Sequence, residues 1–157
     1  MRRLILISFL LIIALLTSCI HSNEISKVAP DEIMGMKKFV VLEGEEAIKR
    51  AQASHGYKLK YIEDAVVVHY TDGKHMVILW ITKYPNSKIA KEENRKMAEK
   101  IKESNMSISL IKINGEDVYN FSISKTHHHY FWSKREYLLY LIPYNIDDYK
   151  VLSSVVK

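Results

Sequence analysis

The sequence predicts a single α+β domain in which hairpins form a mostly antiparallel sheet and helices pack against it. Short segments rich in Val, Ile, Trp and Tyr occur in pairs around turn residues, which is typical of antiparallel hairpins. Amphipathic helical segments lie before, between and after these pairs. We therefore expect the element order α-β-β-α-β-β-β-α. No glycine-rich phosphate loop follows any expected strand, so Rossmann and P-loop folds are excluded.

The first expected elements are a short helix and a hairpin. The helix begins at Gly44, carries two glutamates in its first turn and ends at Gly56, a residue suited to the position after a helix. Residues 65–70 and 75–84 then flank Asp72-Gly73, a strong hairpin signal. Both alternating sets of side chains in the second arm are apolar, so we expect a central strand that is covered on both faces.

The second half of the chain predicts a long helix, further hairpins and a final helix. The long helix is expected from Ser87 to Ser104, with Asn86 or Ser87 as its N-cap. Strand segments are expected at residues 107–113, 117–124, 127–132 and 137–144. Asn145 is expected to cap the last helix, whose apolar stripe would consist of Ile146, Tyr149, Leu152 and Val156.

The N-terminus has the organisation of a secretory signal peptide over residues 1–18. Arg2 and Arg3 precede an apolar run from Leu4 to Leu16, shorter than the roughly 20 apolar residues needed to span a bilayer. The run leads into Leu16-Thr17-Ser18-Cys19, which resembles a lipobox. That resemblance implies cleavage before Cys19, a lipid on its thiol, and retention on the outer, extracytoplasmic face of the cell membrane. The alternative is an uncleaved membrane anchor in which Cys19 is an ordinary thiol.

Residues 19–34 are expected to form a tether, because they show no hydrophobic period and contain Pro30. Residues 35–157 are then the expected domain, long enough for one hydrophobic core. Cys19 is the only cysteine, which excludes a disulfide within the chain and thiol catalysis. The formal net charge of +5 falls to +3 without the two N-terminal arginines. This bias is too small to predict nucleic acid as a partner.

Six short motifs occur between residues 35 and 132: Gly44-Glu45-Glu46-Ala47-Ile48, His55-Gly56, the hairpin ending in Trp80, Met97-Ala98-Glu99-Lys100-Ile101, Val118-Tyr119 and His128-His129-Tyr130-Phe131. Together they resemble a small family of secreted or lipid-anchored prokaryotic proteins, mainly archaeal, of unknown function. The resemblance implies an extracytoplasmic location and a shared fold, but no activity. Ser124-Lys125-Thr126 stand where that family has glycines.

The histidines form the one cluster in the sequence that could carry chemistry. In a strand, His127 and His129 project from the same face with Cα atoms about 6.5 to 7 Å apart, within reach of one metal ion. A closed zinc or copper site needs more ligands, and His69 and His75 could supply them if the first hairpin lay beside this strand. His55 is a further candidate. The alternative is an aromatic rim with satisfied ring nitrogens.

Aromatic side chains around the last expected hairpin predict a binding surface. Tyr130, Trp132, Tyr137 and Tyr140 offer rigid area with a polar group, suited to stacking on a glycan or packing against an envelope protein. Asn105 and Asn120 each begin an N-glycosylation pattern. We expect Asn120 to be the better exposed of the two unless a helix covers its face of the strand.

The sequence thus predicts a lipid-anchored binding or accessory module, with a metal-binding protein built on His127 and His129 as the alternative. Enzyme motifs are weak. Ser122 and Lys125 have the Ser-x-x-Lys spacing of some acyl-transfer enzymes, but in a strand their side chains lie on opposite faces. No catalytic residue is therefore assigned.

Overall fold

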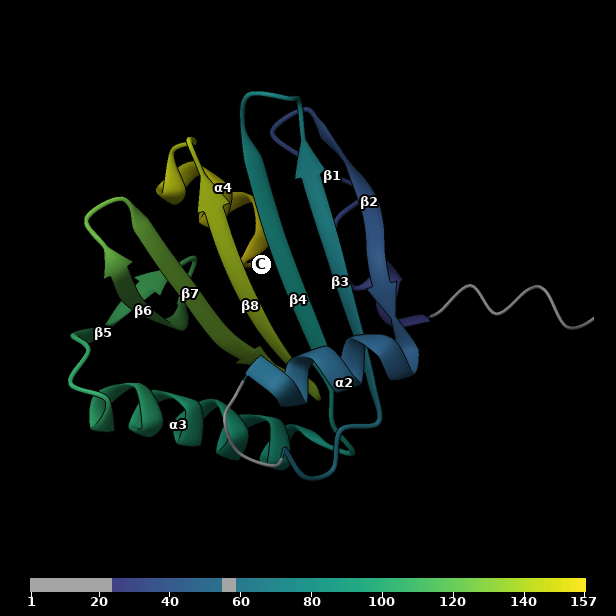
Figure 1. The fold of residues 1–157 in the computed structure, drawn as a ribbon, viewed down its shortest axis with the longest axis vertical. Coiled ribbons are helices and arrows are strands. Elements are labelled where there is room, and N and C mark those ends of the chain that lie inside the picture. The colour runs from purple at the N-terminus through teal and green to yellow at the C-terminus, as the bar shows by residue number, and fades with distance from the viewer. Residues whose placement is uncertain (1–23, 55–58) are drawn as a thin grey trace, which may run out of the picture.

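The computed structural model of the chain describes residues 24–54 and 59–157, which form one eight-stranded sheet and its covering helices (Figure 1). The elements are η2 (Glu24–Lys27), β1 (Glu32–Ile33), β2 (Met36–Glu43), α2 (Gly44–Ser54), β3 (Asp64–Thr71), β4 (Met76–Lys83), α3 (Ser87–Glu103), β5 (Ile108–Ile113), β6 (Glu116–Ser124), β7 (His127–Lys134), β8 (Tyr137–Tyr144) and α4 (Asp148–Val155). The sheet order is β1-β2-β3-β4-β8-β7-β6-β5, and every neighbouring pair is antiparallel. The predicted α+β fold is confirmed.

The centre of the sheet is the pairing of β4 with β8, which joins two series of hairpins. Ile78 of β4 lies opposite Ile142 of β8, although 64 residues separate them in the chain. Side chains of β4 alternate between the two faces, and both sets are apolar, as predicted for a central strand.

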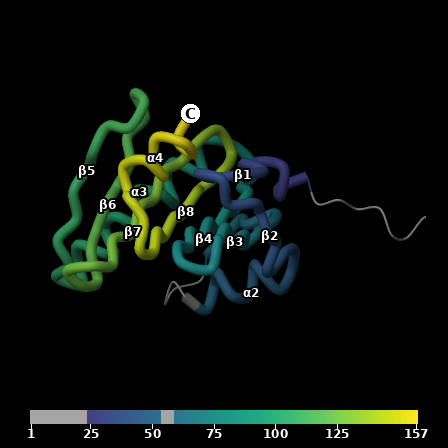
Figure 2. Tube along the Cα trace, turned by 90° about the horizontal axis from the view of Figure 1, so that it is seen from above, coloured from purple at the N-terminus to yellow at the C-terminus, as the bar shows by residue number. Residues whose placement is uncertain are grey.

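One face of the sheet, the α4 face, carries the largest core cluster. Val77, Leu79 and Ile81 of β4 pack there with Trp132 of β7 and Leu152 of α4. The opposite face, the α2/α3 face, is covered by α2 over β3 and by α3 over β7 and β8. Figure 2 shows α4 and α2 on opposite sides of the sheet. No helix in residues 24–54 or 59–157 is long and apolar enough to cross a membrane.

The folded domain begins earlier than predicted, because residues 24–34 are part of it. Ile25, Ala29 and Ile33 are at most 2% exposed and belong to the core of the α4 face. The ammonium group of Lys38 donates to the carbonyls of Ser26 and Ala29, at 2.9 and 3.2 Å. The predicted tether is therefore wrong for this segment. Cys19 and the expected signal peptide lie outside the described residues.

Other boundaries also differ from the prediction. β1 and β2 precede the first helix, and the four strand segments expected between α3 and α4 are all present, one more than the expected element order contains. The last helix is capped by Asp147, whose carboxylate accepts the backbone N–H of Lys150, and not by Asn145. Its buried side chains are Val151 and Leu152, whereas Tyr149 is 66% exposed. Leu152 and Val156 of the predicted stripe are buried in the core of the α4 face and Ile146 packs against it, so the prediction is wrong only at Tyr149.

Candidate functional site

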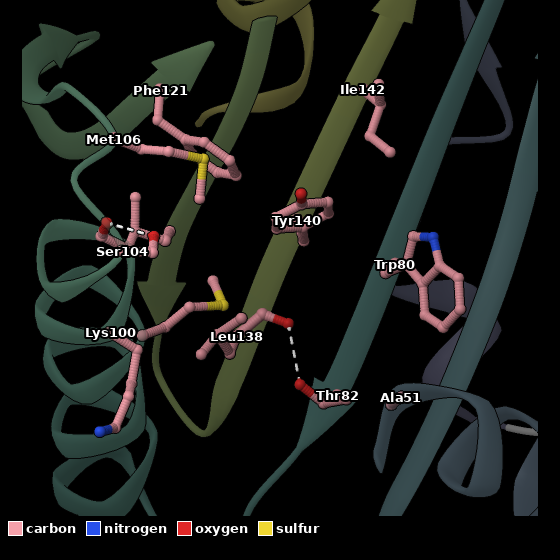
Figure 3. Close-up of a pocket in the computed structure, with 12 residues that line it drawn as sticks. Ala51, Trp80, Thr82, Lys100, Ser104, Met106, Phe121, Leu138, Tyr140 and Ile142 are labelled. Carbon is pink, nitrogen blue, oxygen red and sulfur yellow. Dashed lines mark hydrogen bonds between the residues drawn. The ribbon is translucent and has the colours of Figure 1, made fainter. Parts of the chain in front are cut away.

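A pocket of about 430 Å³ lies on the α2/α3 face, where the two helices leave the middle of the sheet partly uncovered (Figure 3). Its floor is made by β4, β6 and β8 with Trp80, Thr82, Phe121, Leu138, Tyr140 and Ile142. Its walls are Ala51 of α2, Met97, Lys100, Ile101 and Ser104 of α3, and Met106 after α3. The lining is mostly apolar and aromatic, with two methionine thioethers that can adapt to a ligand's shape.

The wall contributed by α3 follows from the sequence of that helix. Asn86 is the N-cap, and its side-chain oxygen accepts the backbone N–H of Ile89 at 3.1 Å, so the helix begins at Ser87 as predicted. The buried stripe includes Met97 and Ile101, both predicted, and it turns their side chains toward the sheet. Lys100 and Ser104 lie at the edge of this stripe, so they line the pocket beside the apolar residues.

All three hydroxyl groups that line the pocket already have a hydrogen-bond partner in the protein. Thr82 donates to the carbonyl of Leu138 at 3.3 Å (Figure 3). Ser104 donates to the carbonyl of Ile101 at 2.7 Å. The Tyr140 hydroxyl lies 2.5 Å from Nδ1 of His129. The pocket therefore offers few free polar groups to a ligand.

The Tyr140–His129 pair is neutral at physiological pH. His129 is 7% exposed, and burial lowers its pKa to about 4, an effect to which neighbouring His127 and His128 add. Burial also raises the pKa of Tyr140 well above its usual value. The two side chains consequently share a hydrogen bond between uncharged groups. Lys100 is then the one charged side chain in the described lining, and its Nζ lies 2.6 Å from Oε2 of Glu103.

The structure brings His127 and His129 to the same face of β7 but places His69 and His75 elsewhere. The rings of His127 and His129 contact those of Tyr144 and Tyr140, at centroid distances of 5.7 and 5.6 Å. His69 lies on β3, with β4 and β8 between it and β7, which corresponds to about 14 Å across the sheet.

His75 is engaged within its own hairpin, because its Nδ1 lies 2.8 Å from Asp72. With His128, Asp147 and Asp148 it lines an open depression of about 650 Å³ toward the α4 face. Among the described residues, no three His, Cys, Asp or Glu side chains are placed to hold a metal ion. Zinc or copper binding stays a prediction, and His55 lies outside the described residues.

The predicted aromatic surface is wrong for two of its four residues. Tyr130 and Trp132 are 5% and 1% exposed, because their positions on β7 point into the core of the α4 face. Tyr130 also donates to Asp148 at 2.7 Å, which ties β7 to α4. Tyr137 is half-buried, and Tyr140 forms part of the pocket floor.

Asn105 is the better exposed of the two glycosylation candidates, which is the outcome expected where a helix covers the face of Asn120. Asn105 is exposed, just after the end of α3. Asn120 is half-buried, accepts a hydrogen bond from Ser109 at 2.9 Å, and lies opposite Tyr130, over which α4 packs.

Sequence reasoning found Tyr140 but missed the rest of the pocket floor. Thr82, Phe121, Leu138 and Ile142 all lie in strands that were predicted, but no local pattern indicates that two helices cover the same face and leave a gap between them. No family model matches the chain, and no curated protein sequence matches it.

Proposed function

We propose that the protein is a lipid-anchored, extracytoplasmic binding module whose ligand site is the pocket between α2 and α3. The observation that carries this proposal is the apolar pocket of about 430 Å³, a size within the roughly 300 to 1,000 Å³ of small-molecule sites. Such sites combine a largely apolar lining with a few polar groups, as this one does. Binding is favoured over catalysis because the hydroxyls and His129 are occupied by one another or by backbone carbonyls.

The lipid anchor is supported by the apolar N-terminal run and by Cys19 at its end. Only four residues separate Cys19 from Glu24, the first residue that the structure describes, and these five peptide steps span at most about 18 Å. An anchored domain would thus lie close to the membrane surface. Cell fractionation tests the anchor, and the wild type is expected in the membrane fraction. Mass spectrometry of the N-terminal peptide should show the mass of the lipid in the wild type and its loss in Cys19→Ser. Lipidation would be refuted if the N-terminal peptides of the wild type and of Cys19→Ser differed in mass only by the substitution itself.

The pocket is tested by filling it. The uncharged apolar dye N-phenyl-1-naphthylamine should bind residues 23–157 saturably, with one site and increased fluorescence. Met106→Trp places a larger side chain in the pocket and should weaken binding at least tenfold. Leu110→Trp is the matched control, because Leu110 is 53% exposed on β5 outside the pocket. The proposed site would be refuted if the dye showed no saturable binding, or if both variants bound it equally well.

Metal binding is the second candidate, favoured by the shared face of His127 and His129. Native mass spectrometry with Zn²⁺ and Cu²⁺ should show one bound ion in the untagged wild type and none in a His127→Ala, His129→Ala double variant. Equal loading of both proteins would exclude these two ligands.

A further inference from the structure

We propose that the pocket takes a single-chain anionic amphiphile, with its hydrocarbon chain on the pocket floor and its head group at Lys100. This inference rests on the proposed function, since it names the ligand class of the same site. It follows from three properties of the lining: the state of its hydroxyls, the sign of its charge and its volume.

The floor favours hydrocarbon over a polar ligand such as a sugar. Sugars bind through many hydrogen bonds, and each unmatched polar group that is buried costs free energy. The hydroxyls of Thr82 and Ser104 donate to backbone carbonyls, and the hydroxyl of Tyr140 is paired with His129, so each already has a partner in the protein. A methylene chain needs no such partners and gains from contact with Trp80 and the two methionines.

The charge of the lining favours an anionic head group. None of the pocket-lining residues in the described part of the chain carries a carboxylate, whereas Lys100 carries an ammonium at the α3 wall. The carboxylate of Glu103 pairs with this ammonium at 2.6 Å. Since an ammonium has three N–H donors, other donors are left to bind a head group. His129 adds no positive charge, because it is neutral at physiological pH. A cationic head group would find no carboxylate in the described lining, and Glu103 beside it is already paired with Lys100.

The volume favours one chain. About 430 Å³ lies near the lower end of small-molecule sites, which suits a single alkyl chain and not a two-chain membrane lipid. Each methylene added to the ligand should tighten binding about fourfold until the pocket is full.

The test compares three ligands with the same ten-carbon chain: decanoate, decanol and decyltrimethylammonium, below their micelle concentrations at pH 7.5. The protein is residues 23–157, which contain every residue of the three core clusters. Calorimetry should give decanoate an affinity about fivefold higher than decanol at low salt, the size expected for one exposed ion pair. Added salt should reduce this preference, and decyltrimethylammonium should bind most weakly.

Substitution of Lys100 then separates the contribution of the head-group charge to ligand affinity from the contribution of the hydrocarbon chain. Lys100→Gln should remove the preference for decanoate and leave decanol affinity unchanged. Lys102→Gln is the matched control, because Lys102 is exposed on the same helix and does not line the pocket. Equal affinities of decanoate and decanol in the wild type, or a preference that survives Lys100→Gln, would overturn this inference but leave the pocket intact. Absence of binding by all three ligands would instead refute the proposed function.

Discussion

Truncation of Ile25 to alanine should lower the free energy of unfolding by about 2 to 4 kcal/mol. Ile25 is 2% exposed and packs in the core of the α4 face. The substitution removes three carbon atoms, and each buried methylene or methyl contributes about 0.8 kcal/mol, which gives about 2.4 kcal/mol. The cavity left behind raises the cost, although η2 lies at the start of the domain and can partly collapse into the space.

Urea unfolding followed by tryptophan fluorescence measures this change, because Trp132 is 1% exposed in the same core cluster. Met34→Ala is the matched control from the same predicted tether. Met34 is 47% exposed, so its truncation should change stability by no more than about 0.5 kcal/mol. If Ile25→Ala and Met34→Ala cost the same, the packing of residues 24–34 in the core of the α4 face is refuted.

Three further perturbations test other parts of the fold. Tyr130→Phe removes the buried hydrogen bond to Asp148 and should cost about 1.5 to 3 kcal/mol in urea unfolding; an unchanged midpoint would mean that this bond does not hold α4 to β7. The pKa of His129 is lowered from 6.5 to about 4 in the folded state, so between these pH values the unfolded chain binds a proton that the folded chain does not. The free energy of unfolding should therefore fall by up to about 3 kcal/mol as the pH drops from about 6.5 to 4. His129→Phe should lose this part of the pH dependence, and a profile identical to that of the wild type would contradict its burial in the neutral form. Asn94→Leu removes a buried side-chain oxygen that has no hydrogen-bond partner among residues 24–54 and 59–157, and it should stabilise the domain by about 1 kcal/mol; a lower melting temperature would show that the amide is satisfied in solution.

The hairpins and helices that were predicted correctly are those whose conformation depends on interactions between residues close together in the sequence. Asp72 shows this at the first hairpin, where its carboxylate accepts the backbone N–H groups of Lys74 and His75 at 2.9 and 2.7 Å. Such a turn depends on four or five consecutive residues and very little on the rest of the fold. The N-cap of α3 is local in the same sense, since Asn86 and Ile89 are three residues apart.

The strand β2 was missed because its position removes the pattern on which strand prediction depends. It lies next to the two-residue strand β1, so most of its length is near the edge of the sheet. Phe39, Val40 and Val41 are all exposed, and the register shifts between Val40 and Leu42. Alternation of buried and exposed side chains, the period-two signal, is therefore absent.

The pocket could not be predicted because it depends on which elements meet, and not on any one of them. Strand alternation correctly indicated that His127 and His129 share a face, but both faces of β7 are covered, so alternation alone could not tell which set is the deeper. The deciding contact is the pairing of β4 with β8, which brings Trp80 and Tyr140 side by side. Once α2 is seated on β3 and α3 on β7 and part of β8, β4 and the rest of β8 are left between the helices. Because α2 and α3 leave this part of the α2/α3 face open between them, the apolar side chains of a central strand become the floor of the pocket.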